Sequence, residues 1–117
     1  MISVIGASSC GLFTASRLAQ AGQQVTLYEK EPAFQPYSRR LIVTPYLSRL
    51  LPIHEELILH RVDTFEFFAN GSRGRIKLKS PDLIIERKDL INCFMAGAQE
   101  SGVDIKQGWS FSGFNQD

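Results

Sequence analysis

The segment Gly6–Gly11, which reads GASSCG, constrains the fold of this chain more than any other feature. It follows a short apolar run at Ile2–Ile5 and precedes a helical pattern that ends near Gly22, after which a second apolar run covers Gln24–Tyr28. Strand, glycine turn, helix and strand in this order predict a β-α-β unit, whose right-handed crossover places the two strands side by side in a parallel sheet. The predicted apolar face of the helix contains Leu12, Ala15, Leu18 and Ala19.

Glycine turns of this kind occur where a dinucleotide-binding fold holds a pyrophosphate. The first glycine makes a tight turn, a second lets the backbone approach the phosphates, and a third allows close helix–strand packing. Gly6 and Gly11 meet the first and third needs, whereas Ser8 occupies the middle position. A serine hydroxyl can donate to a phosphate oxygen if its φ suits an L-residue, and the helix N-terminus favours an anion. The predicted phosphate-binding residues are Gly6, Ala7, Ser8, Ser9, Cys10 and Gly11.

Glu29 supplies the second half of this signature because it ends the second predicted strand. An acid at that place accepts hydrogen bonds from a ribose hydroxyl and repels a phosphate on that hydroxyl, which favours FAD or NAD over NADP. The alternative is that the glycines only permit tight packing and that Glu29 is a solvated strand end. The glycine motif alone is weak, but strand, turn, helix, strand and acid in sequence favour adenine-dinucleotide binding.

The middle of the chain has a different character. Four prolines interrupt residues 32–56, which predict a loop and short helices, including one at about Tyr46–Leu51. Residues 57–86 alternate like β-strands around a turn at Asn70–Gly74, which predicts an antiparallel β-meander. Its apolar alternation predicts a strand face packed on a core, with Phe65 and Phe67 on one strand and Ile76 and Leu78 on the other.

The C-terminal part returns to the α/β pattern. It predicts a helix from about Lys88 to Ser101, a parallel strand at Val103–Ile105 and a candidate further strand at Trp109–Phe114. The fold class is therefore α/β, with a Rossmann-like parallel sheet of the FAD/NAD(P)-binding type and an inserted antiparallel β-meander. We expect a single, incomplete domain, with its dinucleotide-binding core in residues 1–31 and 87–117, loop and short helices in 32–56, and antiparallel strands in 57–86.

Charge argues against a nucleic-acid partner. The 13 Lys and Arg residues nearly balance 12 Asp and Glu residues, so no overall field attracts nucleic acid or anionic lipid. Basic residues in Arg73–Lys79 and aromatic residues in Phe65–Phe68 also fit a platform for single-stranded nucleic acid. Strand alternation accounts for them more simply, because the charges then line the solvated side.

Cysteine and histidine spacing gives no sign of a metal site. Cys10 and Cys93 lie far apart, which fits a reducing compartment, and we expect both to be small buried side chains. His54 and His60 match no zinc template, and no catalytic acid or base can be named. No apolar run is long enough to span a bilayer, and the first strand follows Met1 too closely for a signal sequence, so we expect a cytoplasmic protein.

Three stretches resemble flavoproteins of the para-hydroxybenzoate hydroxylase type, and the geranylgeranyl reductase branch most closely. They are VIGASSCGL with VTLYEK, RRLIVTPYLSRLLPI, and IERKDLINCFMAGAQESGVDI, which together cover nearly the whole chain. The resemblance implies an FAD-dependent oxidoreductase or monooxygenase in which the turn binds the FAD pyrophosphate. By position, the acid and its neighbour are Glu29 and Lys30, and the arginine that opens the later helix is Arg87. The family's basic loop residue corresponds to Arg39 or Arg40, of which Arg40 is the candidate cofactor contact.

The sequence departs from this family in two ways. Ser8 replaces the usual second glycine, and the downstream Gly-Asp motif, most substrate-domain strands and the C-terminal helix are absent from the 117 residues. We therefore expect the chain alone not to be catalytically competent and to need a C-terminal half or a partner chain. An apolar or prenyl-type substrate is implied for the complete protein. The alternatives are a non-catalytic truncated or split module and an NAD-binding domain.

Overall fold

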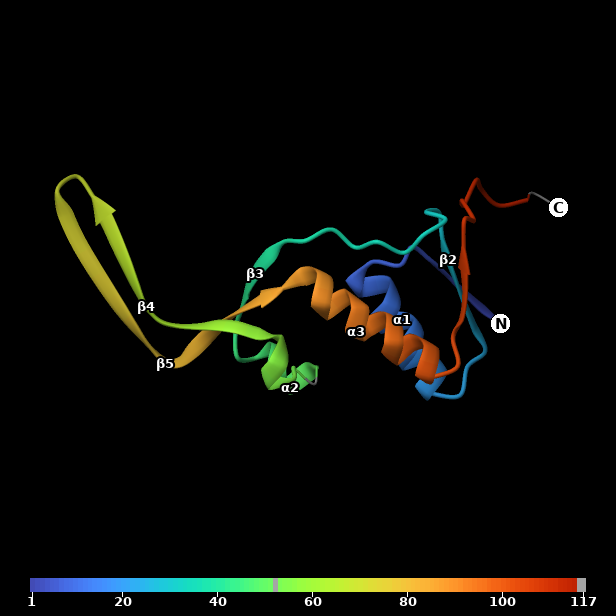
Figure 1. The fold of residues 1–117 in the computed structure, drawn as a ribbon, viewed down its shortest axis with the longest axis horizontal. Helices are drawn as coiled ribbons and strands as arrows, with labels where there is room; N and C mark the ends of the chain where they lie inside the picture. Colours follow the sequence, from blue (N-terminus) through green and yellow to red (C-terminus); the bar gives the residue numbers. More distant parts are fainter. Residues whose placement is uncertain (52, 116–117) are drawn as a thin grey trace. The chain divides into compact units, whose positions relative to one another are not determined.

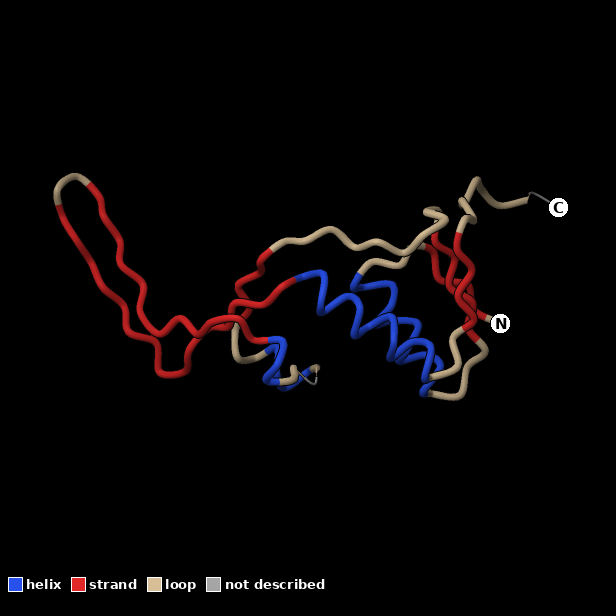
Figure 2. Tube along the Cα trace, in the orientation of Figure 1, coloured by secondary structure: helices blue, strands red, loops and turns tan. Residues whose placement is uncertain are grey.

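The computed structural model describes residues 1–51 and 53–115, which fall into two compact units. One unit contains Met1–Tyr37 together with the chain from Leu90 onward, and the other contains Ser38–Asp89. Each has a three-stranded sheet, parallel in the first unit and antiparallel in the second (Figure 2). The α/β class, with a Rossmann-like parallel sheet and an antiparallel sheet, is confirmed.

The parallel sheet of the first unit has the strand order β1-β2-β6. Its strands are β1 (Ile2–Ile5), β2 (Val25–Glu29) and β6 (Asp104–Gln107), within one or two residues of the predicted ranges. The helices α1 (Ser9–Gln20) and α3 (Arg87–Glu100) run side by side (Figure 1). The glycine turn joins the end of β1 to α1. Because β2 pairs with β1 in parallel, the carboxyl ends of both strands lie at the same edge of the sheet, beside that turn.

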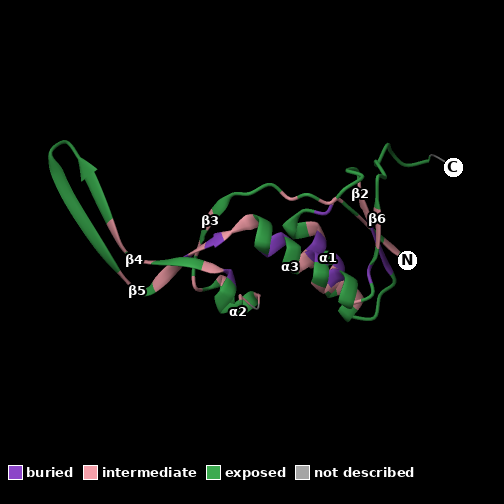
Figure 3. Ribbon diagram, viewed as in Figure 1, coloured by how far each residue is buried: buried purple, intermediate pink, exposed green. Residues whose placement is uncertain are grey.

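Strand and helix periodicity decide which side chains enter the core of the first unit. Val25 and Leu27 alternate with Thr26 and Tyr28 along β2, so each pair faces a different side of the sheet. Buried residues recur at helical spacing in α1 and α3 and meet the sheet (Figure 3). The buried core consists of Ala7, Leu12, Ala15, Val25, Leu27, Ile91, Met95, Ala98 and Val103.

Gly11 allows the first turn of α1 to lie directly against the end of β1. A Cβ atom at this position would overlap the carbonyl oxygen of Gly6 and come within 3.2 Å of its carbonyl carbon. Backbone atoms in a packed turn cannot move aside as a flexible side chain can, so only glycine fits this approach.

We expect Gly11→Ala to lower the free energy of unfolding by about 1–3 kcal/mol, the usual cost of overpacking. Gly97→Ala is the matched control, because a Cβ at that helical glycine of α3 would meet nothing within 4 Å. That control should raise stability by up to about 1 kcal/mol, since alanine favours the helix. Urea unfolding followed by circular dichroism measures both variants, and equal stability of the two would contradict the close approach.

The second unit contains an antiparallel sheet of order β3-β5-β4. Its elements are β3 (Arg40–Val43), α2 (Leu47–Leu50), a short 3-10 helix at Glu55–Leu57, β4 (Ile58–Ala69) and β5 (Ser72–Glu86). The strand β3 lies in the proline-rich stretch where the sequence predicted only a loop and short helices. It forms because the short apolar run LIV pairs along β5, from Arg40 opposite Glu86 to Val43 opposite Leu83.

The long strands β4 and β5 form one hairpin rather than a series of short strands (Figure 2). Asn70 and Gly71 have φ values of 47° and 78°, which give the two-residue turn typical of hairpins, shorter than the predicted Asn70–Gly74. The pairing shifts register between Ile58 and His60 and between Val62 and Thr64. Each shift changes which residues of the two strands face each other, so one register does not hold along the whole hairpin.

The prediction that the apolar face of this hairpin is packed on a core is wrong for its distal part. Phe65 and Ile76 lie opposite each other as alternation requires, but Phe67 and Ile76 are 54% and 53% exposed. A two-stranded ribbon offers its side chains only cross-strand neighbours, so it cannot bury them alone. The buried residues of this unit are instead near its other end, at Leu57, Leu83 and Ile85 (Figure 3).

Candidate functional site

The glycine turn accommodates its serine without strain. Gly6 has a φ of 97°, which favours glycine, whereas Ser8 has a φ of −75° and a ψ of 172°, an extended conformation open to any L-residue. The Oγ atom of Ser8 accepts a hydrogen bond from the Gly11 amide at 3.3 Å and so caps α1. Ser8 therefore replaces a glycine with a helix cap whose hydroxyl proton is still able to reach an anion.

Ser9 and Cys10 begin α1, where backbone amides have no partner within the helix and favour an anion. Cys10 and Cys93 are both exposed, so the expectation that they are buried is wrong. Each cysteine lies on the exposed side of its helix. The buried side of α1 carries Leu12 and Ala15, and the buried side of α3 carries other residues of the core.

Glu29 joins the end of β2 to the glycine turn. Its Oε2 atom accepts a hydrogen bond from the Ala7 amide at 2.8 Å, and its Oε1 atom accepts one from the Glu31 amide at 3.0 Å. Partial burial raises the pKa of Glu29, but the amides of Glu31, Ala7 and Lys30 and the Lys30 charge outweigh it and hold that pKa below its usual value. An ionised, half-buried carboxylate is therefore fixed beside the turn.

We expect Glu29→Gln to lower the free energy of unfolding at pH 7. A carboxylate whose pKa is lowered on folding stabilises the fold above its unfolded-state pKa and loses that contribution as the pH falls through the folded value. The difference from wild type should therefore shrink below about pH 4.5. Urea unfolding at several pH values measures it, with Glu100→Gln at the exposed end of α3 as the control. A difference that does not change with pH would show that the Glu29 charge is not what stabilises the turn.

A pocket of about 290 Å³ opens beside Glu29 at the carboxyl ends of the parallel strands. Ligands of open α/β sheets bind at this edge. One wall comes from the turn and β2, and the other from the segment that follows β6. Its lining residues are Ile5, Gly6, Tyr28, Glu29, Lys30, Trp109, Ser110 and Phe111.

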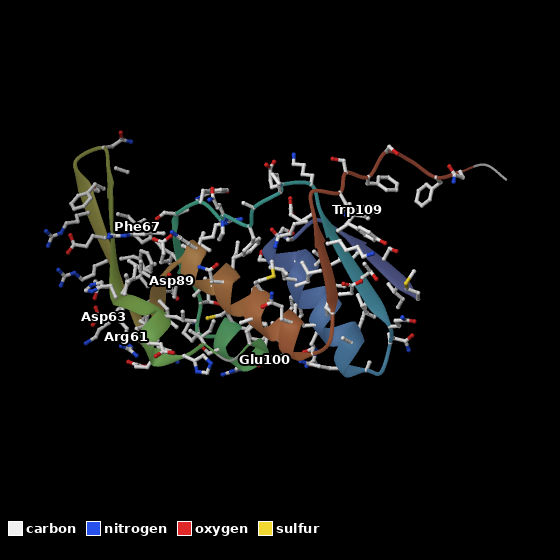
Figure 4. The ribbon with its side chains drawn as sticks, turned by 45° about the vertical axis from the view of Figure 1, so that its right-hand side comes forward. Arg61, Asp63, Phe67, Asp89, Glu100 and Trp109 are labelled. Carbon is white, nitrogen blue, oxygen red and sulfur yellow. The ribbon has the colours of Figure 1, made fainter. Side chains whose placement is uncertain are left out.

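The segment after β6 is tied to the end of β2 by two backbone hydrogen bonds. The Trp109 amide donates to the Glu29 carbonyl at 3.0 Å, and the Gly108 amide donates to the Glu31 carbonyl at 3.2 Å. The Trp109 backbone therefore lies next to that of Glu29. Figure 4 shows Trp109 at the point where the chain leaves β6. The candidate strand at Trp109–Phe114 is wrong, because the described residues 109–115 follow β6 without forming a strand. The sequence did not place Trp109 at the site, although an aromatic residue just after a predicted parallel strand was a usable signal.

Arg40 and Arg87 belong to the second unit, and both are neighbours of Glu86. Arg40 lies opposite Glu86 in the sheet, and Arg87 begins α3. The Glu86 Oε1 atom accepts hydrogen bonds from the Ser38 hydroxyl at 2.9 Å and the Arg39 amide at 2.8 Å. The Arg87 amide donates to the Arg39 carbonyl at 2.7 Å. The loop before β3 is thus pinned to the start of α3.

We expect Glu86→Ala to release this loop, because it removes the acceptor of the Ser38 and Arg39 hydrogen bonds. Limited trypsin digestion with mass spectrometry should then show faster cleavage after Arg39 and Arg40. Glu66→Ala, which breaks the 2.6 Å ion pair with Arg75 on the hairpin, is the control. Cleavage as slow as in wild type would mean that the strand pairing of β3 holds the loop without Glu86.

Other potential sites are weaker. His54 and His60 are exposed. Across residues 1–51 and 53–115, no three His, Cys, Asp or Glu side chains gather closely enough to hold a metal ion. Within the same segments, no helix has both the length and the apolar character needed to cross a membrane.

Comparison with known proteins gives one family match. The family model described as an FAD binding domain matches residues 1–117. No curated protein matches the sequence.

Solved structures share the fold at low sequence identity. A 2-methyl-3-hydroxypyridine-5-carboxylic acid oxygenase is 23% identical with a TM-score of 0.70, and p-nitrophenol 4-monooxygenase from Pseudomonas putida is 18% identical with a TM-score of 0.72. A geranylgeranyl bacteriochlorophyll reductase-like protein from Thermoplasma acidophilum is 16% identical with a TM-score of 0.71. Each comparison covers 91% of this chain, which spans only 30%, 31% and 29% of the three proteins.

Proposed function

The chain belongs to the family of FAD-binding domains, and we propose on that premise that its first unit binds the adenosine and pyrophosphate half of FAD. The family match confirms the resemblance to flavoproteins of the para-hydroxybenzoate hydroxylase type and favours FAD over NAD as the cofactor. The observation that carries the proposal is the Glu29 carboxylate, which is fixed beside the glycine turn and lines the pocket there.

Each part of the turn has a proposed role toward the cofactor. The backbone amides of Ser8, Ser9 and Cys10 are proposed to bind the pyrophosphate, because those of Gly6, Ala7 and Gly11 donate to Tyr28, Glu29 and Ser8. The Ser8 hydroxyl is proposed to donate to the pyrophosphate as well. Glu29 accepts hydrogen bonds from the ribose hydroxyls, and Lys30 supplies a positive charge at the same edge. The proposed contacts in this unit are Gly6, Ala7, Ser8, Ser9, Cys10, Gly11, Glu29 and Lys30.

Arg40 and Arg87 are proposed as further cofactor contacts. Support comes from the resemblance of the stretches RRLIVTP and IERKDL to the family, and from the hydrogen bonds that fix the loop before β3 at the start of α3. Guanidinium groups suit phosphate because they donate in a planar fork.

The activity of the complete protein is proposed to be that of a flavin-dependent oxidoreductase or monooxygenase, with an apolar or prenyl-type substrate. When bound, the flavin supplies the hydride chemistry, whereas protein groups bind and orient the cofactor. The chain spans about 30% of the similar enzymes of known structure, so we propose that it supplies cofactor binding and is not catalytically competent alone. We assign no catalytic acid or base.

A second candidate function is that of a cofactor-binding module completed by further polypeptide. Trp109, Phe111 and Phe114 are 56%, 52% and 89% exposed along a hollow of about 860 Å³ that adjoins the sheet. Exposed apolar groups gathered in one segment favour a covering surface, from a C-terminal half or from a partner chain. The proposed location is cytoplasmic, which the wide sequence separation of Cys10 and Cys93 supports because it fits a reducing compartment.

Calorimetric titration of the purified chain with FAD, NAD and NADP tests the proposed function. We expect FAD to bind most tightly, and Glu29→Arg to weaken FAD binding at least about tenfold, because it removes a charged hydrogen-bond acceptor from the ribose. Glu31→Arg makes the same charge change two residues later and should have a smaller effect. Binding of NAD without binding of FAD would reverse the assignment. Equal losses in the two variants would indicate a general charge effect without a ribose contact.

A further inference from the structure

We propose that Trp109 forms the adenine-binding wall of this site, against which the base of the bound dinucleotide stacks. This inference rests on the proposed function, because Glu29 must hold the ribose. Gly6, Glu29 and Trp109 line one pocket, so a single ligand can reach all three.

The position of the base follows from the chemistry of an adenosine diphosphate group. Adenine and pyrophosphate are attached at opposite ends of the ribose. If the turn holds the pyrophosphate and Glu29 holds the ribose, the base lies beyond Glu29, on the side away from the turn. The Trp109 amide donates to the Glu29 carbonyl at 3.0 Å. The Trp109 side chain therefore starts from a backbone position next to Glu29, the proposed ribose contact.

The indole is both exposed and held in place. Trp109 is 56% exposed, although large aromatic residues are normally buried. Its ring packs against the Tyr28 ring with centroids 5.8 Å apart, and the Lys106 Nζ atom lies 5.4 Å from the Trp109 ring centroid. Because these contacts already hold the Trp109 ring while it stays open to the pocket, the ring loses little conformational freedom when a base stacks on it.

Phe111 also lines the pocket, and its ring, like that of Trp109, packs against another aromatic ring. The Phe111 and Phe114 rings contact each other edge to face, with centroids 5.2 Å apart. Trp109 is nearer to Glu29 along the backbone contacts, and an indole offers a larger surface for stacking than a phenyl ring. The structure therefore assigns the base to Trp109.

Trp109 is the one tryptophan in the sequence, so intrinsic fluorescence reports on this site alone. ADP carries the adenine, ribose and pyrophosphate without the flavin, and FMN carries the flavin without adenine. We expect ADP to quench Trp109 fluorescence with the dissociation constant that calorimetry gives, and Glu29→Arg to weaken this quenching. FMN should bind more weakly than ADP.

Variants separate stacking from folding. Trp109→Ala should weaken binding of ADP and of FAD about tenfold, the usual loss when an aromatic partner of a base is removed. Trp109→Phe should recover most of the affinity, because a phenyl ring still stacks. Phe68→Ala is the control, since Phe68 is a 71% exposed aromatic residue of the second unit, and it should bind both ligands as wild type does.

Failure of this inference is distinguishable from failure of the proposed function. If wild type binds FAD and ADP while ADP leaves the fluorescence unchanged and Trp109→Ala keeps full affinity, the adenine assignment is overturned and the cofactor assignment stands. If FMN binds as tightly as ADP and quenches as strongly, the base is not what meets the indole. If neither FAD nor ADP binds the wild-type chain, both proposals are overturned.

Discussion

The contact between the Glu29 carboxylate and the Ala7 amide is the interaction on which the site depends. It spans 2.8 Å and joins residues 22 positions apart in sequence, at the two strand ends that define the ligand edge of a parallel sheet. The same carboxylate accepts from the Glu31 amide, so it fixes both the turn and the chain that leaves β2. The Glu29 carboxylate, proposed to hold the ribose, is therefore fixed at a set distance from the turn that is proposed to hold the pyrophosphate.

That contact is possible only because the turn is compact. Gly11 brings α1 against the Gly6 carbonyl, and Ser8 caps the helix from inside the same turn. A serine in the middle position therefore contributes twice. It accepts a hydrogen bond from an amide of the helix N-terminus, and it places a hydroxyl in the turn that is proposed to hold the phosphates. The missing glycine of the motif is thus compensated locally.

Local patterns predicted the first unit well and the second less well. The turn, the α3 stripe of Ile91, Met95 and Ala98, and the parallel strands follow from short-range spacing, which the sequence displays directly. Phe67 and Ile76 are exposed because the two-stranded part of the hairpin has no other described element of the chain packed on its apolar face. The alternation of a sequence shows which residues share a face, but it does not show whether another element covers that face. The proposed role of Trp109 depends on pairing between β2 and β6, far apart in sequence, so only the folded chain brings it beside Glu29.

The ADP half and the flavin half of the cofactor require different groups from the protein. The glycine turn, Glu29 and Trp109, proposed for the pyrophosphate, the ribose and the base, lie in the first unit, whereas Arg40 and Arg87 belong to the second. Backbone hydrogen bonds connect the groups of the first unit: Gly6 to Tyr28 at 2.8 Å, and Trp109 to Glu29 at 3.0 Å. The proposed recognition of the ADP half therefore draws mainly on one β-α-β unit and the strand that extends it. The flavin ring, which lies at the other end of the cofactor, has no comparable set of groups proposed in this unit. We therefore expect the adenine nucleotide part to carry the affinity for this chain, and the polypeptide proposed to complete the site to cover Phe111 and Phe114 after β6.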